Sequence, residues 1–402
     1  MLDVGRLLCG NLNAGEVLRH GRNTATMPRE LLRFSQDKKP VVVWNTSRRC
    51  NLHCIHCYTE SNDQDYPNEL SRQEGLALID QLADFGVPVL LLSGGEPLYR
   101  PDILELASYA VGKGLRVVLS TNGSLITPEL AREIKTAEVS YAGVSLDGVG
   151  EVHDRFRGVK GTFQKSLEGI RHCQEAGVKA GLRFTITRHN YHQIDDIFQL
   201  VVDEGIGRLC FYHLVDVGRG KNRSQIALQP HETRVLVGQI FQKTRELYQK
   251  GYEKEVLMVD NHADAPYMYL KLLEEDPQRA KEVYNLMLWN GGNNSGIAFG
   301  CVDEQGFVHP DQFWRNHSLG NVRQRPFGEI WTDTSNPLMA GLKDRKALLE
   351  GRCSECRFLE ICNGNFRARA EAAYGRVWAQ DPACYLTDQE IDASVPLLEV
   401  IA

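Results

Sequence analysis

Three cysteines near the start of the chain have the type and spacing to hold a metal cluster. Cys50, Cys54 and Cys57 are spaced C-x3-C-x2-C on one short segment. Three thiolates can bind three corners of a [4Fe–4S] cube and leave the fourth iron open, whereas a cluster that only transfers electrons normally has four cysteines. A metal site that performs chemistry keeps an open position. The segment therefore predicts an iron that binds a substrate or cofactor directly.

A second group of cysteines lies near the end of the chain. Cys353, Cys356 and Cys362 are spaced C-x2-C-x5-C, and Cys384 follows after a gap. Four soft ligands in two separate pieces could bind zinc or a fully ligated [4Fe–4S] cluster. The other thiols have no such spacing, and we expect ordinary buried small side chains at Cys9, Cys173, Cys210 and Cys301.

Composition limits the class of protein. A chain of 402 residues suggests two or three domains. The formal net charge is -6 without a long basic run, so neither nucleic acid nor a membrane surface is a favoured partner. The chain lacks an apolar stretch long enough for a membrane span and begins without a signal peptide, so we expect a cytoplasmic protein. In that compartment, clustered cysteines indicate metal rather than disulfides.

The elements that must position these cysteines begin at about residue 40. Short, nearly continuous apolar runs alternate with helical stretches, which is typical of parallel strands buried on both faces. Alternation of this kind predicts an α/β fold with right-handed crossovers. An open six-unit barrel is our interpretation, with a doubly wound sheet as the alternative. The predicted strands are 41–44, 87–92, 117–119, 142–146, 183–186 and 209–212.

Helix starts are also visible between these strands. Ser71 with Glu74 three residues later forms a capping box, and Thr127 followed by Pro128 fits an N-cap and first helical position. In either fold the functional site should lie at the carboxyl ends of the strands. The loop with Cys50 directly follows the first strand.

A glycine-rich turn, Ser93-Gly94-Gly95-Glu96-Pro97, follows the second strand. Alone it would be only a connection between elements. Together with the upstream C-x3-C-x2-C segment it resembles the radical S-adenosylmethionine (radical SAM) superfamily. The resemblance implies a partial (β/α)6 radical SAM barrel. It also implies that the amino and carboxylate groups of SAM chelate the open iron of a [4Fe–4S] cluster, and that the turn holds the amino group.

Further positions match the superfamily one at a time. Where it usually has an aromatic residue before the third cysteine this chain has His56; Tyr58 follows, and either could lie near adenine. Four further SAM contacts are implied by the resemblance, with a capping or turn role as the alternative for each: Asn122, Ser145, Arg183 and Gly218.

The later cysteines resemble the SPASM extension of radical SAM enzymes. That extension has a further cysteine where this chain has Phe366, and more cysteines on an upstream hairpin where only Cys301 remains. The resemblance therefore implies one auxiliary [4Fe–4S] cluster on Cys353, Cys356, Cys362 and Cys384. The expected organisation is an N-terminal segment (1–36), the barrel (37–225), a helical connector (226–295) and a SPASM-like domain (296–402).

Three segments, 50–61, 353–366 and 381–388, look like the tetrapyrrole-modifying branch and most closely like its heme d1-forming members. This implies an enzyme that uses a 5′-deoxyadenosyl radical to remove propionate side chains from 12,18-didecarboxysiroheme. A flavodoxin- or ferredoxin-type protein would supply electrons. The alternatives are a decarboxylase of the siroheme-dependent heme pathway, a peptide-modifying maturase, and a non-enzymatic iron–sulfur carrier or sensor.

A flat substrate with several carboxylates needs aromatic walls and arginines. His309 and His317 are candidates for contact with its iron, although a lone histidine is more often structural. The other candidate substrate contacts are Arg155, Arg157, Arg219, Arg315, Phe313 and Trp314.

Overall fold

The computed structural model describes residues 1–10, 38–221, 226–394 and 397. Within this part, one mixed sheet has the strand order β1-β8-β7-β6-β5-β4-β3-β2-β9-β10-β11. The strands are β1 (Leu2–Asp3), β2 (Val41–Asn45), β3 (Val89–Ser93), β4 (Arg116–Thr121), β5 (Tyr141–Ser145), β6 (Ala180–Ile186), β7 (Arg208–His213), β8 (Glu255–Val259), β9 (Phe299–Val302), β10 (Phe307–His309) and β11 (Gly320–Asn321).

Strands β2 to β8 pair in parallel and in chain order, which is the arrangement of an α/β barrel. All six strands predicted from apolar runs are present as β2 to β7. The structure adds β8 to the parallel set, inside the range 226–295 that we expected to be helical. Strand β8 has five residues and lies between two longer helices. Its short apolar run therefore could not be distinguished in the sequence from the apolar positions of those helices.

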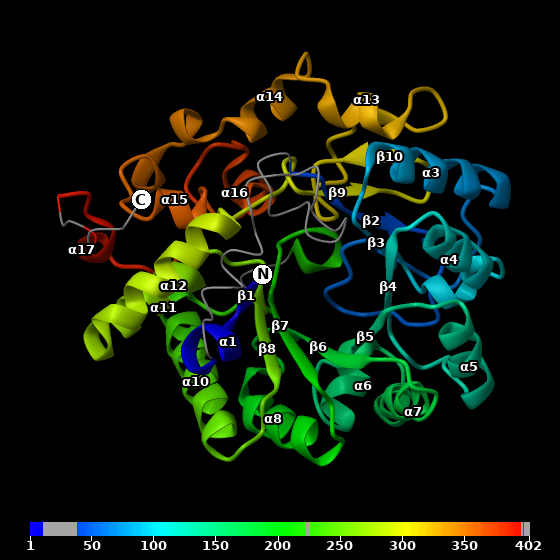
Figure 1. Ribbon diagram of the computed structural model, residues 1–402, viewed down its shortest axis with the longest axis horizontal. Coiled ribbons are helices and arrows are strands. Elements are labelled where there is room, and N and C mark those ends of the chain that lie inside the picture. Colours follow the sequence, from blue (N-terminus) through cyan, green and yellow to red (C-terminus); the bar gives the residue numbers. More distant parts are fainter. Residues whose placement is uncertain (11–37, 222–225, 395–396, 398–402) are drawn as a thin grey trace.

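Helices cover the outer face of the curved sheet (Figure 1). The capping box of Ser71 and Glu74 and the N-cap of Thr127 are both present. Among the described residues, no helix is both long and apolar enough to cross a membrane. The helices are α1 (Val4–Cys9), α3 (Arg72–Phe85), α4 (Ile103–Gly112), α5 (Pro128–Thr136), α6 (Glu151–Arg157), α7 (Thr162–Glu175), α8 (Ile194–Asp203), α10 (Pro230–Gln249), α11 (Asp264–Glu275), α12 (Pro277–Asn290), α13 (Phe327–Thr332), α14 (Pro337–Lys343), α15 (Leu359–Cys362), α16 (Arg367–Tyr374) and α17 (Asp388–Ile391).

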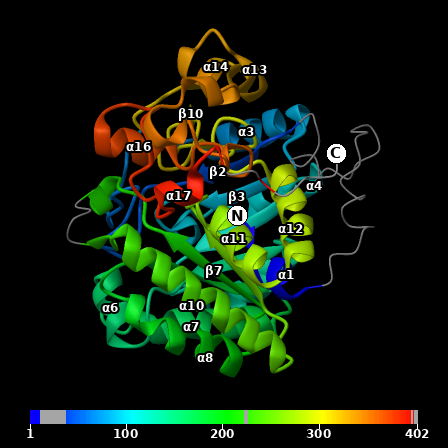
Figure 2. The same cartoon turned by 90° about the vertical axis from the view of Figure 1, so that its left-hand side faces the viewer.

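The C-terminal part is joined to the barrel through the sheet itself. Strand β9 pairs in parallel with β2, and β10 and β11 continue from it as antiparallel strands. One sheet therefore runs across the domain boundary expected at residue 295, and the division into domains stays a prediction. Helices α13 and α14 lie beyond β10 at one end of the molecule (Figure 2).

Candidate functional site

The loop with the first three cysteines begins at the carboxyl end of β2. Cys50 and Cys54 are buried, and Cys57 is half-buried. The backbone N–H of Leu52 donates to Cys50 Sγ at 3.4 Å, and that of Ser61 donates to Cys57 Sγ at 3.5 Å. Donors aimed at sulfur favour the thiolate form that a cluster requires. The donor set therefore fits an iron–sulfur cluster at the edge of the sheet where the site was expected.

The glycine-rich turn lies directly against this loop. Gly95 N–H donates to Ser47 O at 2.7 Å, and a Cβ added to Gly95 would stand 2.3 Å from Arg49 O. Gly94 has φ 128°, a backbone conformation that residues with a side chain rarely adopt. A Cβ added to Gly94 would stand 2.3 Å from Ser47 O. Pro97 begins the short 3-10 helix Pro97–Tyr99. Both glycines are thus required for the turn to dock on the cysteine loop.

Glu96 connects the ends of two strands. Its fully buried carboxylate accepts from Thr121 Oγ1 at 2.7 Å, from Asn122 N–H at 2.8 Å and from Leu98 N–H at 3.1 Å. Burial raises the pKa of Glu96 to about 7 against these hydrogen bonds. Asn122 Nδ2 in turn donates to Asn51 Oδ1 of the cysteine loop at 2.8 Å. Contact of Glu96 and Asn122 with SAM stays a prediction.

A buried ion pair supports the loop from the other side. Arg157, at the end of α6, pairs with Asp147 and donates to Cys54 Sγ at 3.4 Å. The backbone carbonyls of Arg157 and Phe156 accept from His53 N–H at 3.0 Å and Ile55 N–H at 3.1 Å. The expectation that Arg157 binds a substrate carboxylate is therefore wrong, because its guanidinium already serves Asp147 and the thiol.

Replacing Arg157 with glutamine is expected to lower the free energy of unfolding by about 3–5 kcal/mol, because it leaves the fully buried Asp147 without its cation. Urea unfolding under anaerobic conditions measures the change. The matched control is Arg132→Gln, whose partner Glu129 is exposed, and it should cost about 0.5 kcal/mol or less. Equal costs for the two variants would contradict the role assigned to the buried pair.

Gly218 and Arg219 also contact the loop. Arg219 donates through Nε to Cys54 O at 2.8 Å and through a terminal nitrogen to Ser61 O at 2.9 Å. Gly218 has φ 55°, and its added Cβ would stand 2.5 Å from Cys57 O. The two residues therefore clamp the cysteine loop. Contacts of Arg219 with substrate and of Gly218 with SAM stay predictions.

The two remaining arginine candidates for substrate binding, Arg315 and Arg155, lie in different surroundings. Arg315 makes a two-pronged ion pair with the buried Glu304, at 2.7 and 2.9 Å, and its contact with substrate stays a prediction. Arg155 is exposed on α6. An arginine's partners can come from any part of the chain, so its residue type and position alone did not reveal these contacts.

Several residues predicted to contact SAM lie at neighbouring strand ends. Ser145 on β5 is paired in register with Arg183 on β6. Arg183 donates to Tyr212 OH at 3.0 Å and also to Ser120 Oγ. Their grouping on consecutive strands agrees with a shared site, and their contacts with SAM stay predictions.

The two aromatic positions beside Cys57 lie in different surroundings. Tyr58 OH donates to Asn45 Oδ1 at 2.8 Å, and its ring meets Phe313 edge-on with centroids 5.1 Å apart. The His56 ring lies 4.6 Å from Phe156, and burial lowers the pKa of His56 to about 4. A neutral His56 therefore packs against α6, while Tyr58 reaches the ends of β2 and β3.

The histidines considered for the substrate iron are held by the protein. His309 bonds through Nδ1 to His317 O at 2.8 Å and through Nε2 to Asp303 at 3.1 Å. His317 Nε2 lies 2.8 Å from Glu371, which also accepts from Trp314 Nε1 at 2.5 Å. The structural alternative explains these contacts, and they leave Trp314 buried rather than lining a substrate wall.

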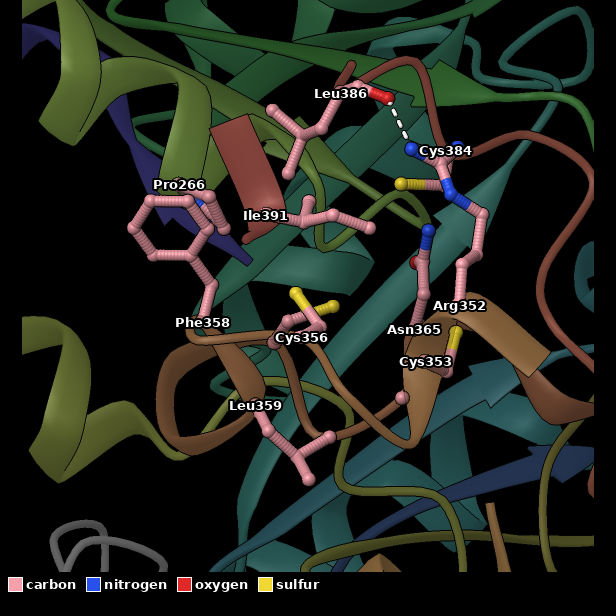
Figure 3. A pocket seen from close by; sticks show the side chains of 12 residues that line it. Pro266, Arg352, Cys353, Cys356, Phe358, Leu359, Asn365, Cys384, Leu386 and Ile391 are labelled. Carbon is pink, nitrogen blue, oxygen red and sulfur yellow. Dashed lines mark hydrogen bonds between the residues drawn. The ribbon is translucent and has the colours of Figure 1, made fainter. Parts of the chain in front are cut away.

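The four later cysteines line one pocket (Figure 3). Burial raises the pKa of Cys356, and the backbone N–H of Phe358 lowers it in part. Burial raises the pKa of Cys384 to about 12, so metal binding there must displace a proton. The donor set of Cys353, Cys356, Cys362 and Cys384 fits an iron–sulfur cluster or zinc.

Phe366, which replaces a cysteine of the SPASM pattern, and Cys301, the hairpin cysteine that remains, are both buried. Phe366 lies in the core, with its ring centroid 5.8 Å from that of Phe313. Cys301 lies on β9, where its sulfur accepts from Asn45 Nδ2 at 3.5 Å. Neither residue lines the pocket of four cysteines.

The four-cysteine segment rests on the carboxyl ends of β7 and β8. Asn261, just after β8, donates to Ala383 O at 3.0 Å and accepts from Asn365 Nδ2 at 2.7 Å. Arg369 donates to Leu214 O, just after β7, at 3.2 Å. The second group of cysteines therefore faces the same edge of the barrel as the first. The roles of Asn261, Asn365 and Arg369 were not predicted from the sequence, because no local pattern marks these residues.

Comparisons with known proteins agree with this geometry. A family model described as the radical SAM superfamily matches residues 44–201. An Fe-coproporphyrin III synthase of Methanosarcina barkeri is 56% identical over 97% of this chain and 99% of its own length. A pre-heme d1 synthase of Dinoroseobacter shibae is 41% identical over 88% and 87%. An AdoMet-dependent heme synthase of Nitratidesulfovibrio vulgaris is 33% identical over 90% and 96%.

The fold has solved counterparts as well. The structure of Streptococcus suis SuiB bound to S-adenosylmethionine superposes with a TM-score of 0.68 at 17% identity, over 87% of this chain and 78% of that one. Among the sequence relatives, the Fe-coproporphyrin III synthase is more similar than the pre-heme d1 synthase. That order corrects the expectation that the heme d1-forming proteins are the nearer match.

Proposed function

This chain belongs to the radical SAM superfamily, and from that premise we propose that it converts a siroheme-derived iron tetrapyrrole into Fe-coproporphyrin III. It is a radical SAM enzyme that acts on tetrapyrrole side chains, with SAM and a [4Fe–4S] cluster as cofactors. The observation that carries the finer proposal is 56% identity to an Fe-coproporphyrin III synthase along nearly the whole of both chains.

The residues of the site have separable tasks in this proposal. When bound, the cluster on Cys50, Cys54 and Cys57 supplies the electron that cleaves SAM. Arg157 places a positive charge beside Cys54, and the turn at Gly95 fixes the loop against β3. The protein contributes placement, electrostatics and exclusion of water around the radical chemistry.

We also propose an auxiliary [4Fe–4S] cluster on the four later cysteines. Their shared pocket and the half-burial of all four residues support it. Cys353, Cys356, Cys362 and Cys384 would hold this cluster near the carboxyl ends of β7 and β8, where it would supply electron-transfer chemistry. A flavodoxin- or ferredoxin-type donor is the proposed reductant of the enzyme.

The decisive experiment is anaerobic incubation of the reduced, reconstituted protein with SAM and 12,18-didecarboxysiroheme, followed by mass spectrometry. Formation of Fe-coproporphyrin III with 5′-deoxyadenosine is the expected result. A product that has lost two propionates would favour the pre-heme d1 synthase activity of the second relative instead. Failure of the reduced protein to cleave SAM would favour an electron carrier, and co-purification with a precursor peptide would favour a maturase.

A further inference from the structure

Two arginines near the four-cysteine pocket are buried without a carboxylate partner. Arg345 is 2% exposed and Arg367 is 0% exposed. Arg367 donates to the backbone carbonyls of Gly364, Val377 and Ala379. Among the described residues, neither guanidinium forms an ion pair; the contacts of Arg345 are with Asn293 Oδ1, Ser295 O and Leu342 O.

Carbonyl oxygens satisfy the N–H groups of a guanidinium but do not neutralise its charge. Burying a charge is costly unless an opposite charge lies close. The nearby carboxylate of Asp381 is already engaged, because Arg369 holds it in a two-pronged pair at 2.8 Å for each contact. Burial accordingly lowers the pKa of Arg345 to about 9. The buried carboxylates of Asp311 and Asp381 attract Arg345 and Arg367, respectively, but form no ion pair with them, so each guanidinium is compensated only from a distance.

Both arginines lie directly behind residues that form the pocket. The Gly364 carbonyl that Arg367 binds belongs to a residue lining the pocket with the cysteines. Asn293, which Arg345 binds, donates through its backbone N–H to Cys362 O at 3.1 Å and accepts from Asn363 Nδ2 at 2.7 Å. Arg367 is attracted by Asp381 and then by the sulfurs of Cys353 and Cys362. Arg345 is attracted by Asp311 and then by the sulfur of Cys362.

We propose that Arg345 and Arg367 are the counter-charges of the auxiliary cluster and that they raise its reduction potential. The inference rests on the proposed second cluster. A [4Fe–4S] cluster on four cysteinates carries a net charge of about −2 when oxidised and about −3 when reduced. Buried positive charges stabilise the more negative state more strongly. Arg369 does not contribute in this way, because Asp381 cancels its charge.

The test uses the full chain with Cys50, Cys54 and Cys57 replaced by alanine, so that only the second cluster can assemble. Iron content is measured first, and a redox titration with dithionite is then followed by electron paramagnetic resonance. Arg367→Gln and Arg345→Gln remove a charge but keep donors. Each should lower the ratio of reduced to oxidised cluster at a fixed potential about tenfold, which is about 59 mV for a one-electron couple. Arg367→Lys and Arg345→Lys keep the charge and should stay within about twofold.

The outcomes separate the inference from its premise. Full iron content with an unchanged potential in both glutamine variants would overturn the role of the arginines and leave the cluster standing. An equal shift in the lysine and glutamine variants would also overturn it, since loss of shape rather than of charge would then be the cause. Absence of iron from the chain that lacks only Cys50, Cys54 and Cys57 would contradict the existence of the second cluster. If Arg367→Gln cannot assemble the cluster, Arg345→Gln decides.

Discussion

Replacing Cys353 and Cys356 together with alanine is expected to abolish tetrapyrrole turnover while SAM is still cleaved to 5′-deoxyadenosine. The two thiols line the four-cysteine pocket, which is separate from the loop that carries Cys50. Without them an auxiliary cluster loses two of its four ligands. Turnover should fall more than about 100-fold, because even changes around a metal's ligands cost up to that much. Product and 5′-deoxyadenosine are quantified in the same reaction by liquid chromatography with mass spectrometry.

The matched control for this variant removes two other thiols, Cys9 and Cys173, which belong to neither group and do not line the four-cysteine pocket. It should retain both SAM cleavage and turnover. Iron per chain should fall from about eight to about four in the double variant at 353 and 356, and stay near eight in the control. Tetrapyrrole turnover at the parent rate in the double variant would rule out an auxiliary cluster with a part in the reaction.

Replacing Cys54 with alanine is expected to eliminate SAM cleavage altogether. Cys54 is buried beside Arg157, and its two partner thiols cannot hold the cube that leaves one iron open for SAM. Iron should again fall to about four per chain, now from the first cluster. The assay is anaerobic formation of 5′-deoxyadenosine from SAM with dithionite and no tetrapyrrole. Residual formation within about tenfold of the parent would contradict the assignment of this loop as the SAM-cleaving site.

The variant at Cys54 can be distinguished from simple unfolding. Cys173→Ala serves as the control for loss of a buried thiol, since that residue is fully buried in the core and faces no pocket of cysteines. It should leave SAM cleavage intact even where it lowers stability. A second cluster that still assembles in the variant at Cys54 would show that the C-terminal part remains folded.

Strands and candidate cysteine ligands are both marked by short local patterns. A buried parallel strand is a nearly continuous apolar run, so β2 to β7 could be found from the sequence. The strand β8 is five residues long and lies between α10 and α11, so helical periodicity on both sides obscured it. Its pairing with β7 joins residues far apart in the chain, such as Arg208 and Glu255, which no local window contains.

The roles of charged residues could not be predicted in this way. Arg157 was expected to meet substrate, yet it serves Asp147 and Cys54, and Arg219 serves carbonyls of the cysteine loop. A guanidinium reaches partners over several ångströms in any direction, so its function follows from which strand ends and helix ends surround it. Arg367 shows this most clearly. Only the structure shows that its guanidinium is buried, binds the carbonyl of Gly364 and has no carboxylate paired with it.

The sequence by itself determined which cysteines are grouped and how they are spaced, and ligand type and spacing limit what metal a group can bind. The spacing of Cys50, Cys54 and Cys57 was sufficient for an open iron. Only the tertiary structure decided that both groups lie along one edge of the barrel, with Asn261 and Arg369 joining the second group to the ends of β8 and β7. Such contacts join residues far apart in the chain, so they arise only when the elements of the whole sheet pack together.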